Sequence, residues 1–251
     1  MAGRQIGGDL DKATALALLT EGELSIVGRL LEASNATFYC AVRRPESKPG
    51  AGRIASCVYK PIRGERPLYD FPDGTLARRE VGAFAVSEAS GWDAIPPTVL
   101  RDGPFGPGMV QLWMEVDPAV DVSSLIDADL VPLRRMAVLD AVLNNADRKG
   151  GHLLPLLDGR ILGVDNGLCF AVEPKLRTIL WRWRGMPLDD AEVAGLERLA
   201  AAMSGELGAR LGELLSPEEL QAACDRLDAL LTKRRFPRPD RNRPAIPWPP
   251  F

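Results

Sequence analysis

Two short acidic motifs lie close together in this sequence. Asp147 stands in the run Asn145-Ala146-Asp147-Arg148, and Asp165 begins the run Asp165-Asn166-Gly167. Phosphoryl transfer needs one carboxylate to orient the attacking hydroxyl group and a second carboxylate to hold the metal ion that neutralises the phosphates. A helix, a loop and a short hairpin that ends at Asp165 would supply both carboxylates from one small region. The two motifs therefore indicate phosphoryl-transfer chemistry.

Hydrophobic spacing predicts the elements that position these motifs. Apolar residues recur from Val131 to Leu143 as in a largely buried helix, which stops at Asn144-Asn145. A polar loop, 147–152, follows this helix. Residues 153–157 and 161–164 are typical of short strands joined by the turn Asp158-Gly159. The second strand would deliver Asp165 at its end.

The residues before this region predict a β-rich half. Strands are expected at 23–31, 37–43 and 54–60, connections at 31–36 and 45–52, and a hairpin that joins 98–100 to 109–115. A helix is expected from Thr75 to Ser90, with Thr75 as its N-terminal cap. After Phe170 the chain is expected to be helical, and Ser216-Pro217-Glu218-Glu219 is a strong helix start.

Glu80 is an unusual residue within the helix expected at 75–90. The apolar stripe of that helix consists of Ala77, Val81, Phe84 and Ala85, and Glu80 lies on its edge. A carboxylate beside a buried stripe is costly unless it is paired. The pattern therefore predicts a partner for Glu80.

The residues around the two acidic motifs resemble a known catalytic core. The segment Val138–Arg148, together with Val164–Phe170, is similar to the core of the phosphatidylinositol 3- and 4-kinase-like superfamily. It resembles in particular type II phosphatidylinositol 4-kinases, HipA-type serine kinases and an actinobacterial branch of the superfamily. The resemblance covers roughly Leu24 to Phe170, and it implies a two-lobe kinase-like fold with ATP in the cleft between the lobes.

The resemblance assigns roles to four charged residues. It makes Asp147 the catalytic-loop carboxylate and Asp165 the metal-binding carboxylate. Lys60, at the end of its strand, matches the lysine that contacts the α and β phosphates of the nucleotide. Glu80 would then be the ion-pair partner of Lys60, which explains the carboxylate beside the apolar stripe.

Five further residues would contact the nucleotide if the resemblance holds. The turn 31–37 would lie over the phosphates, with Ser34 and Asn35 as donors. The segment Gln111 to Glu115, with Trp113 at its centre, would form the hinge beside adenine.

His152 is a departure from the family pattern. Five residues after its catalytic Asp the family usually has Asn as a second metal ligand, and here that position holds the one histidine in the chain. Imidazole suits Mn²⁺ better than Mg²⁺. Three hypotheses stay open: an active enzyme that prefers Mn²⁺, a histidine that contacts phosphate or substrate, or a degenerate site that binds nucleotide without turnover. His152 could also simply cap the loop by hydrogen bonding.

Two other groups have structural interpretations that outweigh functional ones. Arg148 is expected to hold the loop through a carboxylate rather than to bind phosphate. The run Trp181-Arg182-Trp183-Arg184 is expected to be packing, with Arg stacked on the rings, rather than a platform for a ligand.

Composition excludes several classes of protein. With 251 residues, 46% of them hydrophobic, and a net charge of −3, the chain can build a core and is not disordered. The acidic balance argues against a nucleic-acid binder. No apolar run is long enough for a membrane span, and no signal peptide is evident, so a cytoplasmic location is the default. The four cysteines form no metal-binding pair and are expected to be reduced, mostly buried thiols.

The C-terminal segment is rich in Arg and Pro. It is expected to lie extended along the body of the protein. Lys233-Arg234-Arg235 through Arg243 could touch an anionic membrane surface, but a solvated tail anchored by Trp248 and Phe251 is the favoured interpretation.

These observations predict one α+β kinase-like domain. It would have a β-rich N-lobe at about 1–115, a small helical C-lobe at about 116–235 and a Pro/Arg-rich tail at 236–251. The favoured function is ATP-dependent transfer of the γ-phosphate to a hydroxyl of a protein, an inositol-type head group or another small polyol, with Mg²⁺ or Mn²⁺ as cofactor. The alternatives are a nucleotide-binding pseudokinase that acts as a regulatory module and a nucleotidyl (AMP) transferase on the same fold.

Overall fold

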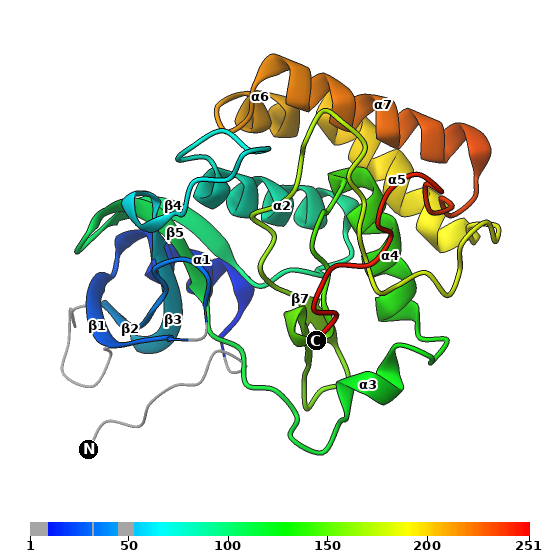
Figure 1. The fold of residues 1–251 in the computed structure, drawn as a ribbon. Helices are drawn as coiled ribbons and strands as arrows, with labels where there is room; N and C mark the ends of the chain where they lie inside the picture. The colour runs from blue at the N-terminus through cyan, green and yellow to red at the C-terminus, as the bar shows by residue number, and fades with distance from the viewer. Residues whose placement is uncertain (1–9, 32, 45–52) are drawn as a thin grey trace. The chain divides into compact units, whose positions relative to one another are not determined.

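A computed structural model describes residues 10–31, 33–44 and 53–251, and Figure 1 draws its ribbon. The predicted connection at 45–52 lies outside the described residues, as does Glu32 of the predicted turn. The chain divides into two compact units. The first comprises Met1–Val81 and Pro96–Glu115, and the second comprises Gly82–Ile95 and Val116–Phe251.

The first unit is built on an antiparallel sheet of five strands in the order β1-β2-β3-β5-β4. The strands are β1 Glu23–Arg29, β2 Phe38–Arg44, β3 Arg53–Pro61, β4 Thr98–Gly103 and β5 Gly106–Leu112. β1 carries a register shift between Ile26 and Gly28. Alternating buried residues, such as Cys40 and Val42 on β2, form the core side of the sheet. All five strands were predicted, with bounds that differ by a few residues.

A helix that the sequence did not indicate, α1 Lys12–Glu21, precedes the sheet. Asp11 caps it by accepting a hydrogen bond from the Thr14 amide, which lowers the pKa of Asp11. Arg101 of β4 donates to the carbonyls of Leu19 and Gly22 at the other end. The helix buries Ala15, Leu18 and Leu19 in the core. Arg101, which holds the C-terminal end of α1, lies about eighty positions further along the chain, so this contact could not be inferred from the local sequence.

The helix α2, Leu76–Ser90, begins as predicted, but Thr75 is not its cap. The Thr75 hydroxyl donates to the Pro72 carbonyl instead. The Glu65 carboxylate takes the place of the cap, since it accepts hydrogen bonds from the amides of Leu76 (3.1 Å) and Ala77 (2.9 Å). A carboxylate at a helix N-terminus satisfies two amides that have no partner within the helix and also suits the helix dipole.

The second unit is mostly helical. Its helices are α3 Val122–Leu125, α4 Val131–Leu143, α5 Asp190–Met203, α6 Glu206–Gly212 and α7 Pro217–Lys233. Its hairpin pairs β6 Leu153–Pro155 with β7 Ile161–Gly163, after the 3₁₀ turn Gly150–His152. Nine of the 13 residues of α4 are buried, and α7 begins with the predicted capping box of Ser216 and Glu219. The α+β fold class predicted from the sequence is confirmed.

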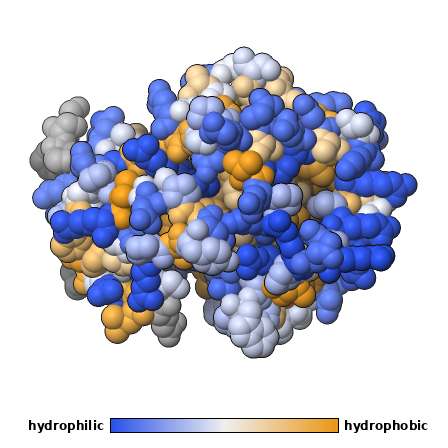
Figure 2. Space-filling model, turned by 45° about the horizontal axis from the view of Figure 1, so that its top comes forward, coloured by the Kyte–Doolittle hydropathy of each residue, from blue (hydrophilic) through white to orange (hydrophobic). Residues whose placement is uncertain are grey.

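Hydrophobic side chains are mainly internal in both units. On the face drawn in Figure 2, the hydrophobic side chains form small separate groups among hydrophilic ones. Cys40, Cys57 and Cys169 are buried, Cys224 is half-buried and all four are free thiols, as predicted. Within the described residues, no helix combines the length and the apolar character that a membrane span requires.

The C-terminal segment lies extended on the second unit, as predicted, and the ring of Phe251, one of its two expected anchors, lies against Gly150. Phe236 is buried and exchanges backbone hydrogen bonds with Gly185 and Met186. The carbonyl of Ala245 accepts from the Thr178 amide, and that of Pro250 accepts from the Gly150 amide. Trp248, by contrast, is 89% exposed, so the prediction that it anchors the tail is wrong.

The run 181–184 is packing, as the sequence indicated. Trp183 is buried and its indole nitrogen donates to Asp129 Oδ1 at 2.7 Å. The Arg134 guanidinium lies over the rings of Trp183 and Phe236 and forms a bidentate ion pair with Glu192. These contacts leave no aromatic platform at Trp183 for a ligand.

Candidate active site

Asp147 lies in the loop that follows α4. The helix ends at Asn144, which adopts a left-handed conformation with φ 54°, and Asn145 Oδ1 accepts a hydrogen bond from the Asp147 amide. The Asp147 side chain is about one quarter exposed, and its Oδ2 lies 3.1 Å from Lys149 Nζ. Burial raises the pKa of Asp147, while Lys149 lowers it and the nearby Asp165 carboxylate raises it. The loop therefore presents a carboxylate with increased affinity for protons beside a cation.

A buried polar network holds this loop. Arg148 is fully buried, and its guanidinium forms a bidentate pair with Asp140 of α4, at 2.9 to 3.1 Å. The same guanidinium donates to the Val164 carbonyl (2.9 Å) and to Asn166 Oδ1 (2.6 Å). The prediction that Arg148 holds the loop through a carboxylate is confirmed. Because Arg148 joins α4 to the segment 164–166, it ties the Asp147 loop to the residues beside Asp165.

Asp165 follows β7 and faces His152. Its backbone is left-handed, with φ 57°, and its side chain is 52% exposed. His152 Nε2 lies 3.4 Å from Asp165 Oδ2, and His152 Nδ1 accepts a hydrogen bond from the Lys149 amide at 3.5 Å. His152 thus caps the loop through one ring nitrogen, which is one of the hypotheses left open, and its other ring nitrogen lies beside the Asp165 carboxylate. Its role as a metal ligand stays a prediction.

Asp165 and His152 can supply only part of the ligand set that a divalent ion needs. Within the described ranges, no three His, Cys, Asp or Glu side chains gather closely enough to hold a metal ion. Mg²⁺ in phosphoryl-transfer sites commonly has one or two protein ligands and takes the rest from phosphates and water. Two donors next to each other on an octahedral ion lie about 3 Å apart, close to the 3.4 Å observed. The donor set therefore fits an ion that arrives with a nucleotide.

Lys60 and Glu80 form the predicted ion pair within the first unit. Lys60 lies on β3, opposite Met109 of β5, and its Nζ lies 2.7 Å from Glu80 Oε1. The Glu80 side chain is 2% exposed and that of Lys60 is 20% exposed. The partner expected for the carboxylate beside the α2 stripe is therefore Lys60. The role of Lys60 at nucleotide phosphates stays a prediction.

The turn 33–37 is fastened to the segment that follows β3. Ala36 donates its amide to the Gly64 carbonyl at 3.0 Å, and the Arg66 amide donates to Asn35 Oδ1 at 2.8 Å. Ser34 is exposed, whereas the Asn35 side-chain oxygen is already used in this contact. Of the two predicted phosphate donors, Asn35 thus has a structural task that the sequence did not reveal.

The predicted hinge residues differ in their surroundings. Gln111 is buried in β5, and its Nε2 donates to Thr98 Oγ1 of β4 at 2.9 Å. The Trp113 ring packs edge-on against Tyr39, with 5.0 Å between centroids. Glu115 is exposed, and the chain passes from the first unit to the second directly after it. The Gln111 side chain is engaged within the sheet.

Three residues that belong to this arrangement were missed by sequence reasoning. Lys149 pairs with Asp147, Asp140 pairs with Arg148, and Glu65 caps the helix that carries Glu80. Lys149 had a signal, because the chain has few lysines and this one lies two residues after Asp147. Asp140 and Glu65 had none, since their partners are determined by tertiary contacts.

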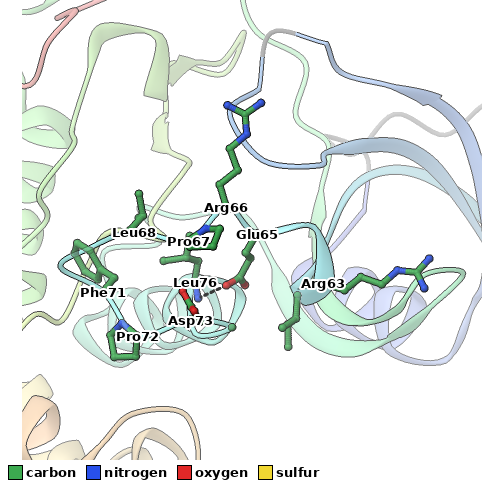
Figure 3. Close-up of a pocket in the computed structure, with 11 residues that line it drawn as sticks. Arg63, Glu65, Arg66, Pro67, Leu68, Phe71, Pro72, Asp73 and Leu76 are labelled. Atoms are coloured by element: carbon green, nitrogen blue, oxygen red, sulfur yellow. Dashed lines mark hydrogen bonds between the residues drawn. The ribbon is translucent and has the colours of Figure 1, made fainter.

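One pocket lies in the first unit, beside the N-terminus of α2. It has a volume of about 220 Å³ and is lined by residues from Ile62 to Leu76, including Arg63, Glu65 and Phe71. Figure 3 shows Glu65 pointing toward Leu76, whereas the Arg63 and Arg66 side chains extend away from it. None of the predicted site residues lines this pocket.

A sequence relative covers nearly the whole chain. Protein Rv2133c of Mycobacterium tuberculosis is 44% identical over 270 aligned residues, which span 94% of this chain and 95% of the relative. No protein-family model matches the chain.

Solved structures of kinases share the fold at low sequence identity. A hydra Fam20 structure with sugar has a TM-score of 0.54 at 15% identity and covers 90% of this chain and 89% of its own. The Golgi casein kinase with Mn and ADP bound has a TM-score of 0.55 at 13% identity, with coverage of 88% and 75%. The Helicobacter pylori kinase CtkA has a TM-score of 0.53 at 13% identity, with coverage of 87% and 94%. These similarities show a protein-kinase-like fold, whereas membership of the phosphatidylinositol-kinase superfamily stays a prediction.

Proposed function

Because the chain belongs to the same family as protein Rv2133c and has a protein-kinase-like fold, we propose that it is an ATP-dependent phosphotransferase. The observation that carries this proposal is the cluster of Asp147, Lys149, His152 and Asp165, held by the buried Arg148 network. Two carboxylates of different exposure, one paired with a cation and one with an imidazole, match the two tasks of phosphoryl transfer. A protein that only packed a hairpin here would have no need for this set of charges.

Each residue would have a distinct task. Asp147 orients the acceptor hydroxyl and accepts its proton, for which a raised pKa is favourable. Lys149 lies at 3.1 Å from Asp147 and supplies positive charge where the transferred phosphoryl group becomes more anionic. Asp165 and His152 would hold the divalent ion, which neutralises phosphate charge when bound.

The pair of Lys60 and Glu80 completes the proposal on the side of the nucleotide. A lysine held by a buried glutamate is kept in one position and can contact phosphate oxygens at a fixed point. The phosphate contact of Lys60 and the metal contact of Asp165 are two separate parts of the proposal, each testable by its own substitution. The Golgi casein kinase structure contains Mn and ADP, which supports a nucleotide with a divalent ion as the cofactor set, Mg²⁺ or Mn²⁺. We also propose that the enzyme is of the phosphatidylinositol-kinase-like type and acts in the cytoplasm. Its acceptor would be a hydroxyl group on a protein or on a small polyol.

His152 favours one alternative. A histidine where the related kinases usually have asparagine would also suit a pseudokinase that binds nucleotide without transfer, acting as a regulatory module. AMP transfer from the same fold is the other alternative. ATP labelled at one phosphate separates all three. A kinase would transfer label from the γ-phosphate to the acceptor, an AMP transferase would transfer label from the α-phosphate, and a pseudokinase would transfer neither.

Thermal unfolding with and without ATP tests the nucleotide site. A ligand at about 100 times its dissociation constant stabilises the native state by about 2.7 kcal/mol. We expect this shift for the wild type with Mg²⁺ or Mn²⁺, and its loss in Asp165→Ala. Asp158→Ala is the matched control, since Asp158 lies in the turn of the same hairpin and forms a half-exposed ion pair with Arg160. No shift with either metal, or an equal loss in the control, would contradict the proposal.

A further inference from the structure

The second unit gathers basic residues from two distant segments onto one surface. Ten of the 31 Lys and Arg residues lie in 175–184 and 233–243, whereas only Asp240 of the 34 acidic residues does. We call these ten residues the basic face: Lys175, Arg177, Arg182, Arg184, Lys233, Arg234, Arg235, Arg238, Arg241 and Arg243. A chain with a net charge of −3 thus carries a strongly positive region.

Contacts of the C-terminal segment bring the two halves of the basic face together. The Arg235 guanidinium donates to the Gly185 carbonyl, next to Arg184. The Leu188 amide donates to the Arg234 carbonyl. Further along, the Arg243 guanidinium donates to the Pro174 carbonyl, next to Lys175. The Arg235 and Arg243 guanidinium groups donate to backbone carbonyls, so these two hydrogen bonds order the side chains without neutralising their charge.

Charge repulsion makes this arrangement unfavourable by itself. Like charges in one region destabilise the compact state unless an anionic partner compensates them. Two acidic side chains lie close to members of the basic face: Asp240 faces Arg243 at 3.7 Å, with both about half exposed, and Arg177 lowers the pKa of the nearby Asp147. The concentration of arginine therefore points to a negatively charged partner.

Exposed apolar side chains accompany the basic face. Trp248 is 89% exposed and Ile246 is 52% exposed, and both follow Arg243 directly along the chain. Met186, which is 44% exposed, lies two residues after Arg184, and its carbonyl accepts a hydrogen bond from the Phe236 amide. Because Trp248 does not anchor the segment, its large apolar surface is available for contact. Arg and Lys beside exposed Trp and Ile match the chemistry of a bilayer surface, which has anionic head groups above an apolar interior.

We propose that the basic face, with Ile246 and Trp248, binds the surface of a bilayer that contains anionic lipid. An acidic protein would satisfy the arginines but has no requirement for an exposed Trp, whereas the bilayer interface accounts for both. The proposal does not depend on ATP or on phosphotransfer, and it concerns adsorption to the surface rather than insertion of a helix.

Flotation with lipid vesicles tests this proposal in the absence of nucleotide. We expect the full chain to float with vesicles of phosphatidylcholine and phosphatidylserine, and not with phosphatidylcholine alone. Binding should weaken as salt is added, because exposed charges are screened. The double variant Arg182→Glu with Arg241→Glu should lower the partition coefficient by about thirtyfold or more. Both side chains are exposed.

A matched control carries the same change in charge elsewhere on the second unit. Arg160→Glu with Arg210→Glu reverses two exposed arginines outside the basic face and should bind vesicles like the wild type. Trp248 should shift its fluorescence to shorter wavelength on anionic vesicles, and Trp248→Phe should remove that change while leaving the thermal midpoint intact. Equal binding to both lipid mixtures, or equal loss in the control, would overturn the proposal. Tighter binding to polyglutamate than to anionic vesicles would overturn it in favour of an acidic protein partner.

Discussion

The substitution Asp140→Asn tests whether the buried ion pair holds the catalytic loop. Asp140 and Arg148 are both fully buried, and Arg148 makes three of its hydrogen bonds to this one carboxylate. Asparagine keeps the shape of the side chain and removes its charge. The guanidinium would remain buried without its counter-ion, because it also bonds to Val164 and Asn166 and has no route to solvent.

The expected loss follows from this burial. Breaking a buried ion pair by removing one partner typically costs about 3 to 5 kcal/mol, since an uncompensated charge is left in the interior. At about 2 to 4 °C per kcal/mol for a chain of this size, the midpoint of thermal unfolding would fall by about 6 to 20 °C. The nucleotide-dependent shift should also weaken, because the loop that carries Asp147 and the segment before Asp165 lose their common link.

Differential scanning calorimetry of Asp140→Asn and Asp158→Asn measures the effect. Asp158 forms an ion pair with Arg160 in which both side chains are about half exposed, so the same substitution there should change stability by no more than about 0.5 kcal/mol. Equal effects of the two substitutions would refute the reasoning, since a buried pair would then contribute no more than an exposed one.

Four further substitutions test other parts of the arrangement. Glu65→Ala and Ser216→Ala each remove a helix cap, and each should lower the free energy of unfolding by about 1 kcal/mol. Isothermal titration should show weaker ATP binding only for Glu65→Ala, because Glu65 caps the helix that carries Glu80. The raised pKa of Asp147 means that the folded state binds more protons than the unfolded state between the two pKa values, so stability falls as pH rises through that window. Asp147→Asn should therefore raise the midpoint at pH 7, and a gain that persists below about pH 3.9 would contradict this sign. His152→Asn should shift metal preference from Mn²⁺ toward Mg²⁺ in the ATP-dependent thermal shift, and an unchanged preference would remove the metal-ligand role.

Much of the local structure could be predicted because it depends on neighbouring residues. β-branched and aromatic residues bounded by turn signals indicated the strands that became β2 and β3, and the capping box at Ser216 indicated the start of α7. The carboxylate of Glu80 beside an apolar stripe required a partner, and Lys60 is that partner. The inference about Glu80 succeeded because burial of an unpaired charge is costly wherever it lies in the chain.

Other features could not be predicted, because their partners are distant. The cap of α2 is Glu65 rather than the adjacent Thr75, and the end of α1 is held by Arg101 from β4. Trp248 was expected to help anchor the C-terminal segment, yet it is exposed, and backbone hydrogen bonds and the buried Phe236 hold the segment instead. In each case several residues in the sequence could have made the contact, and the tertiary fold determines which of them does.

The sequence by itself determined the chemistry that this protein has available: the two carboxylates Asp147 and Asp165, the lysine at position 60 and the histidine in the loop. Residue type, spacing and periodicity are properties of short segments, and they are readable without the fold. The tertiary structure alone decided which charges meet. Arg148 pairs with Asp140 and Asn166, and His152 lies beside Asp165. Two basic segments about fifty positions apart in the sequence lie next to each other. Such contacts depend on how helices and strands pack, because a buried charge is stabilised by whichever partner the completed fold brings within reach.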